Sequence, residues 1–116
     1  MSYRDALNEA IQHWNSDFIE EEWFFEKFRD DAIGKMSPSE AFCFINETIE
    51  FLIREDDEST ACEILQTIIG LARKSQTTEV PNALVENREV IESQFCQRGE
   101  YSKGKLAELF RYYRIS

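Results

Sequence analysis

The sequence predicts an all-α fold, a compact bundle of about six antiparallel helices in a single domain, residues 1–116. Three observations predict it. Apolar residues recur at three- and four-residue steps, capping and turn residues separate these segments, and no stretch alternates with period two between turn signals. With 42% hydrophobic residues, the 116-residue chain has apolar material for one core and too little length for two.

The first predicted helix is the segment SYRDALNEAIQHWN, residues 2–15. Its apolar residues recur every three or four positions and form a single stripe: Tyr3, Leu7, Ala10, Ile11 and Trp14. This spacing is typical of an amphipathic helix that buries one face.

The second predicted helix carries FIEEEWFFEKFRDD, residues 18–31, which is both strongly acidic and strongly aromatic. At about 100° per residue, four residues share a core face: Phe18, Phe25, Phe28 and Ala32. Trp23 points to the opposite side, and Phe24 lies at one flank. Either the helix is wedged between two layers of neighbours, or it presents Trp23 and Phe24 to solvent within a ring of acids, as in an interface hot spot.

The third predicted helix has the clearest start in the chain. Ser37 is placed as the N-cap, Pro38 occupies the first helical position, and Glu40 completes a capping box. Four apolar residues are then expected to line one face: Phe42, Ile45, Ile49 and Leu52.

The fourth predicted helix begins after the acidic run EDDE. Asp56, Asp57 and Glu58 would lie at or beside the positive end of its dipole. Its apolar positions are Ala61, Ile64, Leu65, Ile68, Leu71 and Ala72. Gly70 inside this helix carries only a small propensity cost.

Two further helices complete the prediction. After the turn residues KSQTTEVPNA, a fifth helix follows through Leu84, Ile91 and Phe95. The segment QRGEYSKG breaks it, and the last helix is KLAELFRYYRI, residues 105–115, with inward positions Leu106, Leu109, Phe110 and Tyr113. Short connections favour antiparallel hairpins, and the helix lengths also fit hairpin stacking of the HEAT type.

The acidic charge is concentrated in the first half of the chain. Residues 1–63 hold 17 Asp and Glu against 5 Lys and Arg, whereas residues 64–116 hold 6 against 8, within a formal net charge of -10. Such a surface repels nucleic acid and anionic membranes and attracts basic proteins, or it simply keeps the chain soluble. No run approaches a membrane span and no secretory pattern opens the chain, so a cytoplasmic protein is expected.

Residues that could carry catalysis or bind a metal are sparse. His13 is the single histidine, and it has no second ligand at the spacing that metal-binding helices use. Cys43, Cys62 and Cys96 form no C-x-x-C pair and are expected to be buried reduced thiols. The run Glu55 to Glu58 lacks the alternating ligands of a calcium loop and is better explained by helix capping. We therefore expect no enzyme activity, no metal and no cofactor.

Three segments carry a resemblance to a known class of proteins: EEEWFFEKF, the hairpin AFCFINETIEFLIREDDESTACEILQTIIGLARKS, and the turn TTEVP. In this combination of an aromatic first region, a central helical hairpin and small acidic size, the chain resembles bacterial immunity proteins of contact-dependent inhibition and related polymorphic toxin systems. The resemblance implies a protein that binds one cognate toxin domain, often a basic nuclease, and blocks its active site or its access to substrate.

The predicted function is therefore an acidic cytoplasmic immunity protein that neutralises a basic, nuclease-type toxin domain by steric and electrostatic occlusion. The predicted partner-binding residues are Glu20, Glu21, Glu22, Trp23, Phe24, Asp30, Asp31, Glu55, Asp56, Asp57 and Glu58. Two alternatives belong to other classes: an inhibitor that mimics nucleic acid and occupies a DNA- or RNA-binding enzyme, and a small ligand-binding or enzymatic bundle. The sequence leaves the oligomeric state open.

Overall fold

The computed structural model describes residues 3–14 and 24–114, which form six α-helices. In chain order they are α1 (Tyr3–Trp14), α2 (Phe24–Gly34), α3 (Pro38–Arg54), α4 (Glu58–Ser75), α5 (Asn82–Phe95) and α6 (Glu100–Tyr112). These residue ranges contain no strand, so the predicted all-α fold is confirmed.

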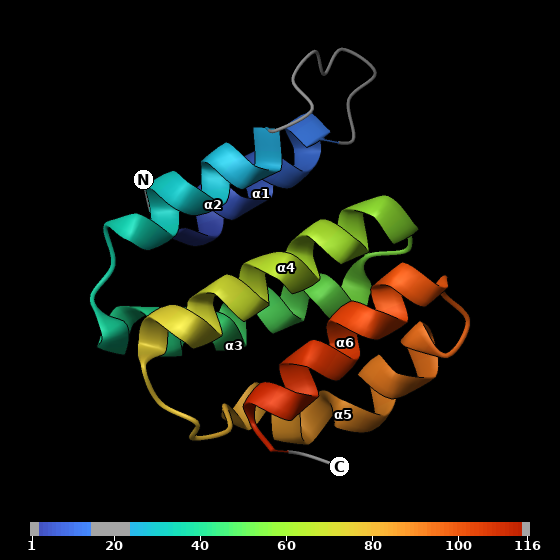
Figure 1. Ribbon diagram of the computed structural model, residues 1–116. Helices are drawn as coiled ribbons and strands as arrows, with labels where there is room; N and C mark the ends of the chain where they lie inside the picture. The colour runs from blue at the N-terminus through green and yellow to red at the C-terminus, as the bar shows by residue number, and fades with distance from the viewer. Residues whose placement is uncertain (1–2, 15–23, 115–116) are drawn as a thin grey trace.

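The six helices form three hairpins stacked side by side in two layers (Figure 1). The hairpins are α1 with α2, α3 with α4, and α5 with α6. One layer consists of α1, α3 and α5, and the other of α2, α4 and α6, so helices are antiparallel within a hairpin and parallel within a layer. The extents of 39 × 34 × 19 Å agree with this, because the shortest equals about two helix diameters.

Helix α4 lies at the centre of this stack. It packs against α3 in its own hairpin and against α2 and α6 on either side. Eleven of its residues are buried, whereas α5 and α6 each bury three. Gly70 allows α2 to approach closely, because a Cβ at this position would lie 2.9 Å from Cδ1 of Ile33. Buried side chains from all six helices join in one hydrophobic core.

The first hairpin is held by aromatic side chains. The predicted stripe of α1 is confirmed, with Tyr3 and Leu7 buried and Trp14 packed against the core. Trp14 meets the Phe25 ring edge to face, with centroids 5.7 Å apart, and only 1% of Phe25 is exposed. The Tyr3 hydroxyl and Thr48 Oγ1 share a buried 2.6 Å hydrogen bond that ties α1 to α3.

The capping prediction for α3 is confirmed. Ser37 Oγ accepts from the Glu40 backbone N–H at 3.2 Å, and the Glu40 carboxylate accepts from the Ser37 N–H at 2.9 Å. The predicted apolar face is correct at Ile45, Ile49 and Leu52, but Phe42 is only partly buried and the buried stripe instead begins at Ala41. The small Ala41 side chain fits the close contact between the layers.

Two sequence-based expectations are wrong. Helix α6 begins at Glu100, five residues before the predicted start, because Glu58 Oε1 accepts a 2.8 Å hydrogen bond from the Gly99 N–H and so holds the start of the helix. The three cysteines are free, but only Cys62 is buried, while Cys43 and Cys96 are exposed. Cys43 lies on α3, and Cys96 is the residue that follows α5 as its C-cap.

Candidate partner-binding surfaces

The aromatic part of the predicted surface lies largely outside the described residues. Glu20, Glu21, Glu22 and Trp23 are not described, and Phe24 is described only as the first residue of α2. Asp30 and Asp31 are both exposed on α2. They differ in direction, because Asp30 lines a groove over α4 and Asp31 does not.

The second predicted group, Glu55 to Glu58, forms the turn between α3 and α4, and most of it has structural partners. Asp57 is the N-cap of α4: its Oδ2 accepts from the Thr60 N–H and hydroxyl, both at 2.9 Å. These hydrogen bonds from Thr60 hold the pKa of Asp57 below its ordinary value. Glu55 accepts from the Asp57 N–H, and Glu58 from the Gly99 N–H. Capping therefore explains this acidic run, as predicted.

Asp56 differs from its neighbours in that turn. Its side chain is exposed and has no hydrogen-bond or ion-pair partner among the described residues. It lines a hollow of about 410 Å³ between the turn and the end of α5, where the Arg98 guanidinium donates to the Glu55 carbonyl at 3.0 Å. Asp56 is thus the acid of the turn whose charge is available to another molecule.

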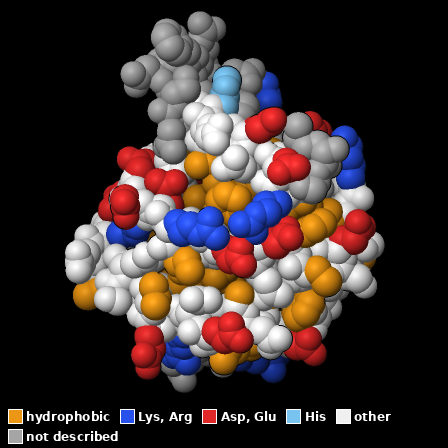
Figure 2. Space-filling view, turned by 180° about the vertical axis from the view of Figure 1, so that it is seen from behind, with side chains coloured by type: hydrophobic (Ala, Val, Ile, Leu, Met, Phe, Trp, Pro, Cys, Tyr) orange, Lys and Arg blue, Asp and Glu red, His pale blue; other side chains and the backbone are white. Residues whose placement is uncertain are grey.

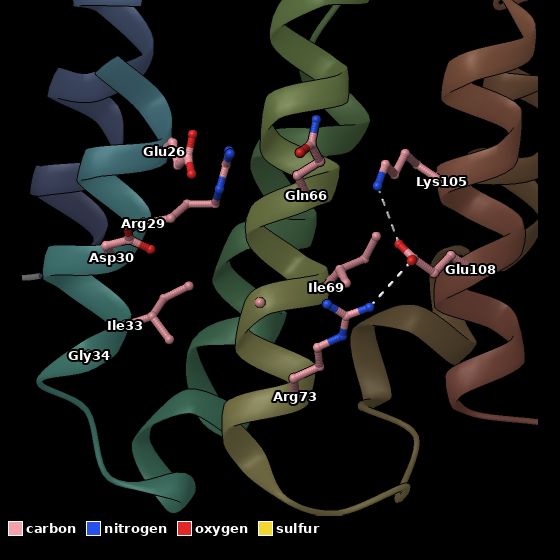
Figure 3. A pocket seen from close by; sticks show the side chains of 11 residues that line it. Glu26, Arg29, Asp30, Ile33, Gly34, Gln66, Ile69, Arg73, Lys105 and Glu108 are labelled. Carbon is pink, nitrogen blue, oxygen red and sulfur yellow. Dashed lines mark hydrogen bonds and ion pairs between the residues drawn. The ribbon is translucent and has the colours of Figure 1, made fainter. Parts of the chain in front are cut away.

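A groove of about 590 Å³ lies over α4, between α2 and α6 (Figure 3). Its lining residues are Glu26, Arg29, Asp30, Ile33, Gly34, Gln66, Ile69, Gly70, Arg73, Lys105 and Glu108. Only Asp30 among them belongs to the predicted surface. Ile33, Ile69 and the bare Gly70 backbone give the floor an apolar character between two charged walls.

The wall formed by α2 has surplus negative charge. Arg29 Nη1 donates to Glu63 Oε2 at 2.7 Å, and these two side chains are only 15% and 20% exposed, so the arginine is fully engaged. Glu26 and Asp30, one helical turn apart, are exposed and have no ion-pair partner among the described residues. Two uncompensated carboxylates therefore face the groove from this wall (Figure 3).

The opposite wall has surplus positive charge. Arg73 of α4 and Lys105 of α6 both pair with Glu108, at 3.3 Å and 3.6 Å (Figure 3). Two cations share one carboxylate, so one positive charge remains uncompensated. The groove is thus polarised across its width, negative at α2 and positive at α4 and α6.

On the reverse face, formed by α1, α3 and α5, acidic, basic and apolar side chains are interspersed (Figure 2). Arg4 and Arg54 both pair with Glu50, and both guanidinium groups lie over the Phe51 ring. The hydrogen bond from Arg4 lowers the pKa of Glu50. Two cations share one carboxylate here as well, while Glu9 of α1 and Glu86 and Glu89 of α5 are exposed and have no ion-pair partner among the described residues.

Metal-binding and membrane-spanning features were sought over the same residues. Within residues 3–14 and 24–114, no three His, Cys, Asp or Glu side chains gather where they could hold a metal ion. His13 is exposed on α1. None of the helices that the structure describes has both the length and the apolar character needed to cross a membrane.

Comparisons of the chain with protein-family models, with curated proteins and with solved structures found no match. The function of this protein is therefore inferred from its own geometry and charge. Sequence reasoning missed most of the groove, because its residues come from three helices far apart in the chain. Gly70 was the available signal: a glycine inside a long helix costs about 1 kcal/mol relative to alanine, which favours a role in close packing or at a recess.

Proposed function

We propose that this protein is an acidic, cytoplasmic immunity protein that binds a cognate toxin domain, basic and of nuclease type, and neutralises it by steric and electrostatic occlusion. The observation that carries the proposal is a group of exposed carboxylates on α2 and in the turn before α4: Glu26, Asp30, Asp31 and Asp56. Like Glu9, Glu79, Glu86 and Glu89 elsewhere on the surface, they have no ion-pair partner among the described residues. They belong to a chain with a net charge of -10. A basic partner gains attraction from these groups without breaking an existing internal pair.

Occlusion requires rigid elements more than reacting groups. The carboxylates Glu26, Asp30 and Asp31 lie on α2, which packs on the central helix α4, and Asp56 lies in a turn whose neighbours are capped and hydrogen bonded. Their backbone positions are therefore set before binding, so little backbone ordering is needed when a partner arrives. Inhibition would then be stoichiometric, with one inhibitor molecule per toxin domain and no turnover.

The charge distribution favours a protein partner over the role of a nucleic-acid mimic. A mimic needs acids that follow one another along a surface like phosphates, and on the face formed by α1, α3 and α5 acidic and basic side chains are mixed (Figure 2). The groove over α4 likewise combines both signs of charge. Such mixed surfaces suit the mixed charges of a folded protein.

The test is neutralisation of a toxin domain identified by affinity capture from the host and then purified. Residual toxin activity is measured against added inhibitor, with and without a chelator. We expect inhibition to saturate at a one-to-one ratio and chelator to change nothing. Inactivation of many toxin molecules by one molecule of this protein would contradict binding by occlusion and indicate an enzyme.

Salt dependence supplies a second test of the same proposal. If the acids steer association, the association rate should fall steeply between low and physiological salt, where the Debye length shrinks to about 8 Å. The dissociation rate should change much less. An association rate that is independent of salt would show that the acidic residues contribute only to solubility.

A further inference from the structure

We infer that the groove over α4 is the docking site for one segment of the partner, a segment that presents basic side chains to α2 and an acidic side chain to Arg73 and Lys105. This inference rests on the proposed function, because it assigns the contact surface for the same partner. It differs from the sequence-based surface, since of the predicted residues only Asp30 lines the groove.

The shape of the groove suits a segment of chain. Its volume of about 590 Å³ lies within the range of about 300 to 1,000 Å³ typical of binding sites. It lies over α4 between α2 and α6, which run parallel to α4 (Figures 1 and 3). Gly70 keeps the floor low, and Ile33 and Ile69 can contact the apolar stem of a lysine or a leucine side chain.

The α2 wall defines the basic side of the occupant. Glu26 and Asp30 lie at positions i and i+4, where like charges repel on a helix surface. Arg29 lies on the same wall but cannot relieve this repulsion, because Glu63 holds it at 2.7 Å and Phe25 packs beneath it with its centroid 5.9 Å from the guanidinium carbon. Two basic side chains from a partner, one helical turn apart, would compensate both carboxylates.

The opposite wall defines the acidic side of the occupant. Glu108 is shared between Arg73 and Lys105, and the Arg73 side chain is 64% exposed. A partner carboxylate can pair with Arg73 while Lys105 retains Glu108. Because the two walls have opposite surplus charge, a segment docked in the reversed orientation would place like charges together. The groove therefore selects the orientation of the docked segment as well as the sign of its charges.

The experiment uses stapled helical peptides as probes and the full-length protein labelled at isoleucine δ1 methyl groups. One peptide carries two lysines one turn apart, a glutamate on the opposite side and leucines between; a second peptide has these charges inverted. We expect the first to shift the methyl signals of Ile33 and Ile69 and to leave those of the fully buried Ile45 and Ile49 unchanged. The inverted peptide should bind about fivefold more weakly or not at all.

Asp30→Asn and Asp31→Asn form the matched pair of variants, because the two residues are adjacent, identical and exposed, yet only Asp30 lines the groove. Asp30→Asn should weaken the first peptide about three- to fivefold, the contribution of an exposed ion pair, and Asp31→Asn should leave its affinity unchanged. If both variants weaken peptide binding equally, the groove is not the docking site, and the peptide is attracted only by the overall negative charge of the protein. Equal binding of both peptides, or no shift at Ile33 and Ile69, would also overturn the docking site. The proposal would also be overturned if the methyl signals shifted with protein concentration in the absence of peptide, because the occupant of the groove would then be a second copy of this protein.

Charge reversal at the same two positions separates this inference from the proposed function. If the toxin domain is neutralised but Asp30→Lys and Asp31→Lys affect its affinity equally, the groove assignment is wrong and the immunity function stands. If the peptide results agree with expectation but no toxin domain is neutralised, the groove binds a basic segment of some other protein and the proposed function fails.

Discussion

The central hairpin and the C-terminal hairpin have the same architecture but very different burial. Helix α4 buries eleven residues, whereas α5 buries only Leu84, Ile91 and Phe95. All three large hydrophobic side chains that the structure shows as exposed, Val85, Val90 and Tyr101, lie in the C-terminal hairpin. The difference follows from position: α3 and α4 have neighbours on both sides, while α5 and α6 have them on one.

In this arrangement the central hairpin contributes most of the buried residues, and the outer hairpins present more surface that a partner could contact. In stacked hairpins each unit contacts only its neighbours, so the outer units open at lower free energy than the central one. The groove combines both regions, because its floor belongs to the rigid α4 while its walls belong to the outer helices α2 and α6. A partner that spans the walls would therefore stabilise the outer hairpins.

Phe25 provides the largest expected effect, and it tests whether the outer hairpin α1–α2 contributes to the core. Only 1% of Phe25 is exposed, and it contacts Trp14 and Phe28. Phe25→Ala should therefore lower the free energy of unfolding by about 3 to 5 kcal/mol, measured by urea denaturation.

Trp23→Ala is the contrast to Phe25→Ala, because Trp23 is a predicted partner anchor. If Trp23 is an interface anchor, the variant should leave the melting temperature nearly unchanged and weaken partner binding by about 2 kcal/mol or more. Strong destabilisation by Trp23→Ala would instead support a residue wedged in the core and would end the anchor hypothesis.

Leu65 and Val85 test the burial difference between hairpins directly. Leu65 of α4 is fully buried, and 63% of Val85 in α5 is exposed. Leu65→Ala should cost about 2 to 5 kcal/mol of unfolding free energy, and Val85→Ala less than about 0.5 kcal/mol. Similar losses at both positions would mean that the two hairpins are equally important to stability.

The sequence predicted those features that depend on neighbouring residues. The capping box of Ser37 and Glu40 involves residues three apart, so a local pattern reveals it. The acidic run before α4 likewise indicates capping, although the pattern does not single out Asp57 as the N-cap. The start of α6 depends instead on Glu58, 41 residues away, which accepts the Gly99 N–H. The groove was missed for the same reason, because Arg29, Arg73 and Lys105 belong to three different helices and line one groove only after the hairpins stack.

Substitution of Asp57 tests how much the N-cap of α4 contributes to the stability of the central hairpin. Asp57→Ala should cost about 1 kcal/mol, since it removes the side-chain cap of α4, while Asp57→Asn should retain most of the cap. Because Thr60 holds the pKa of Asp57 below the ordinary 3.8, its ionised form stabilises the fold above that pH, and this contribution is lost as pH falls through the lower folded value. Acid titration of stability should show that loss in the parent and not in Asp57→Asn.

Substitutions of Tyr3 and Tyr113 have the smallest expected effect on stability. The two residues have the same side chain and belong to the two outer ends of the stack of hairpins. Both hydroxyls are in buried residues, but Tyr3 shares a hydrogen bond with Thr48, whereas the Tyr113 hydroxyl has no hydrogen-bond partner among the described residues. Tyr3→Phe should cost about 0.5 to 1.5 kcal/mol, and the loss is no larger because Thr48 still donates to the Phe44 carbonyl. Tyr113→Phe removes an unpaired buried hydroxyl and should leave stability unchanged or raise it by up to about 1 kcal/mol.

The dependence of stability on alkaline pH gives a second comparison of Tyr3 and Tyr113. Burial raises the pKa of both tyrosines above the ordinary 10.0, so the folded state keeps them neutral while the unfolded state ionises. Their contribution is therefore present below about pH 10 and is lost as pH rises beyond it. Each phenylalanine variant should reduce that alkaline loss, measured by urea denaturation across the alkaline range, although the two variants act in opposite directions at neutral pH. If Tyr113→Phe destabilised the protein at neutral pH as much as Tyr3→Phe, the Tyr113 hydroxyl would have a partner in solution, and the C-terminal hairpin would be held more firmly than its burial indicates.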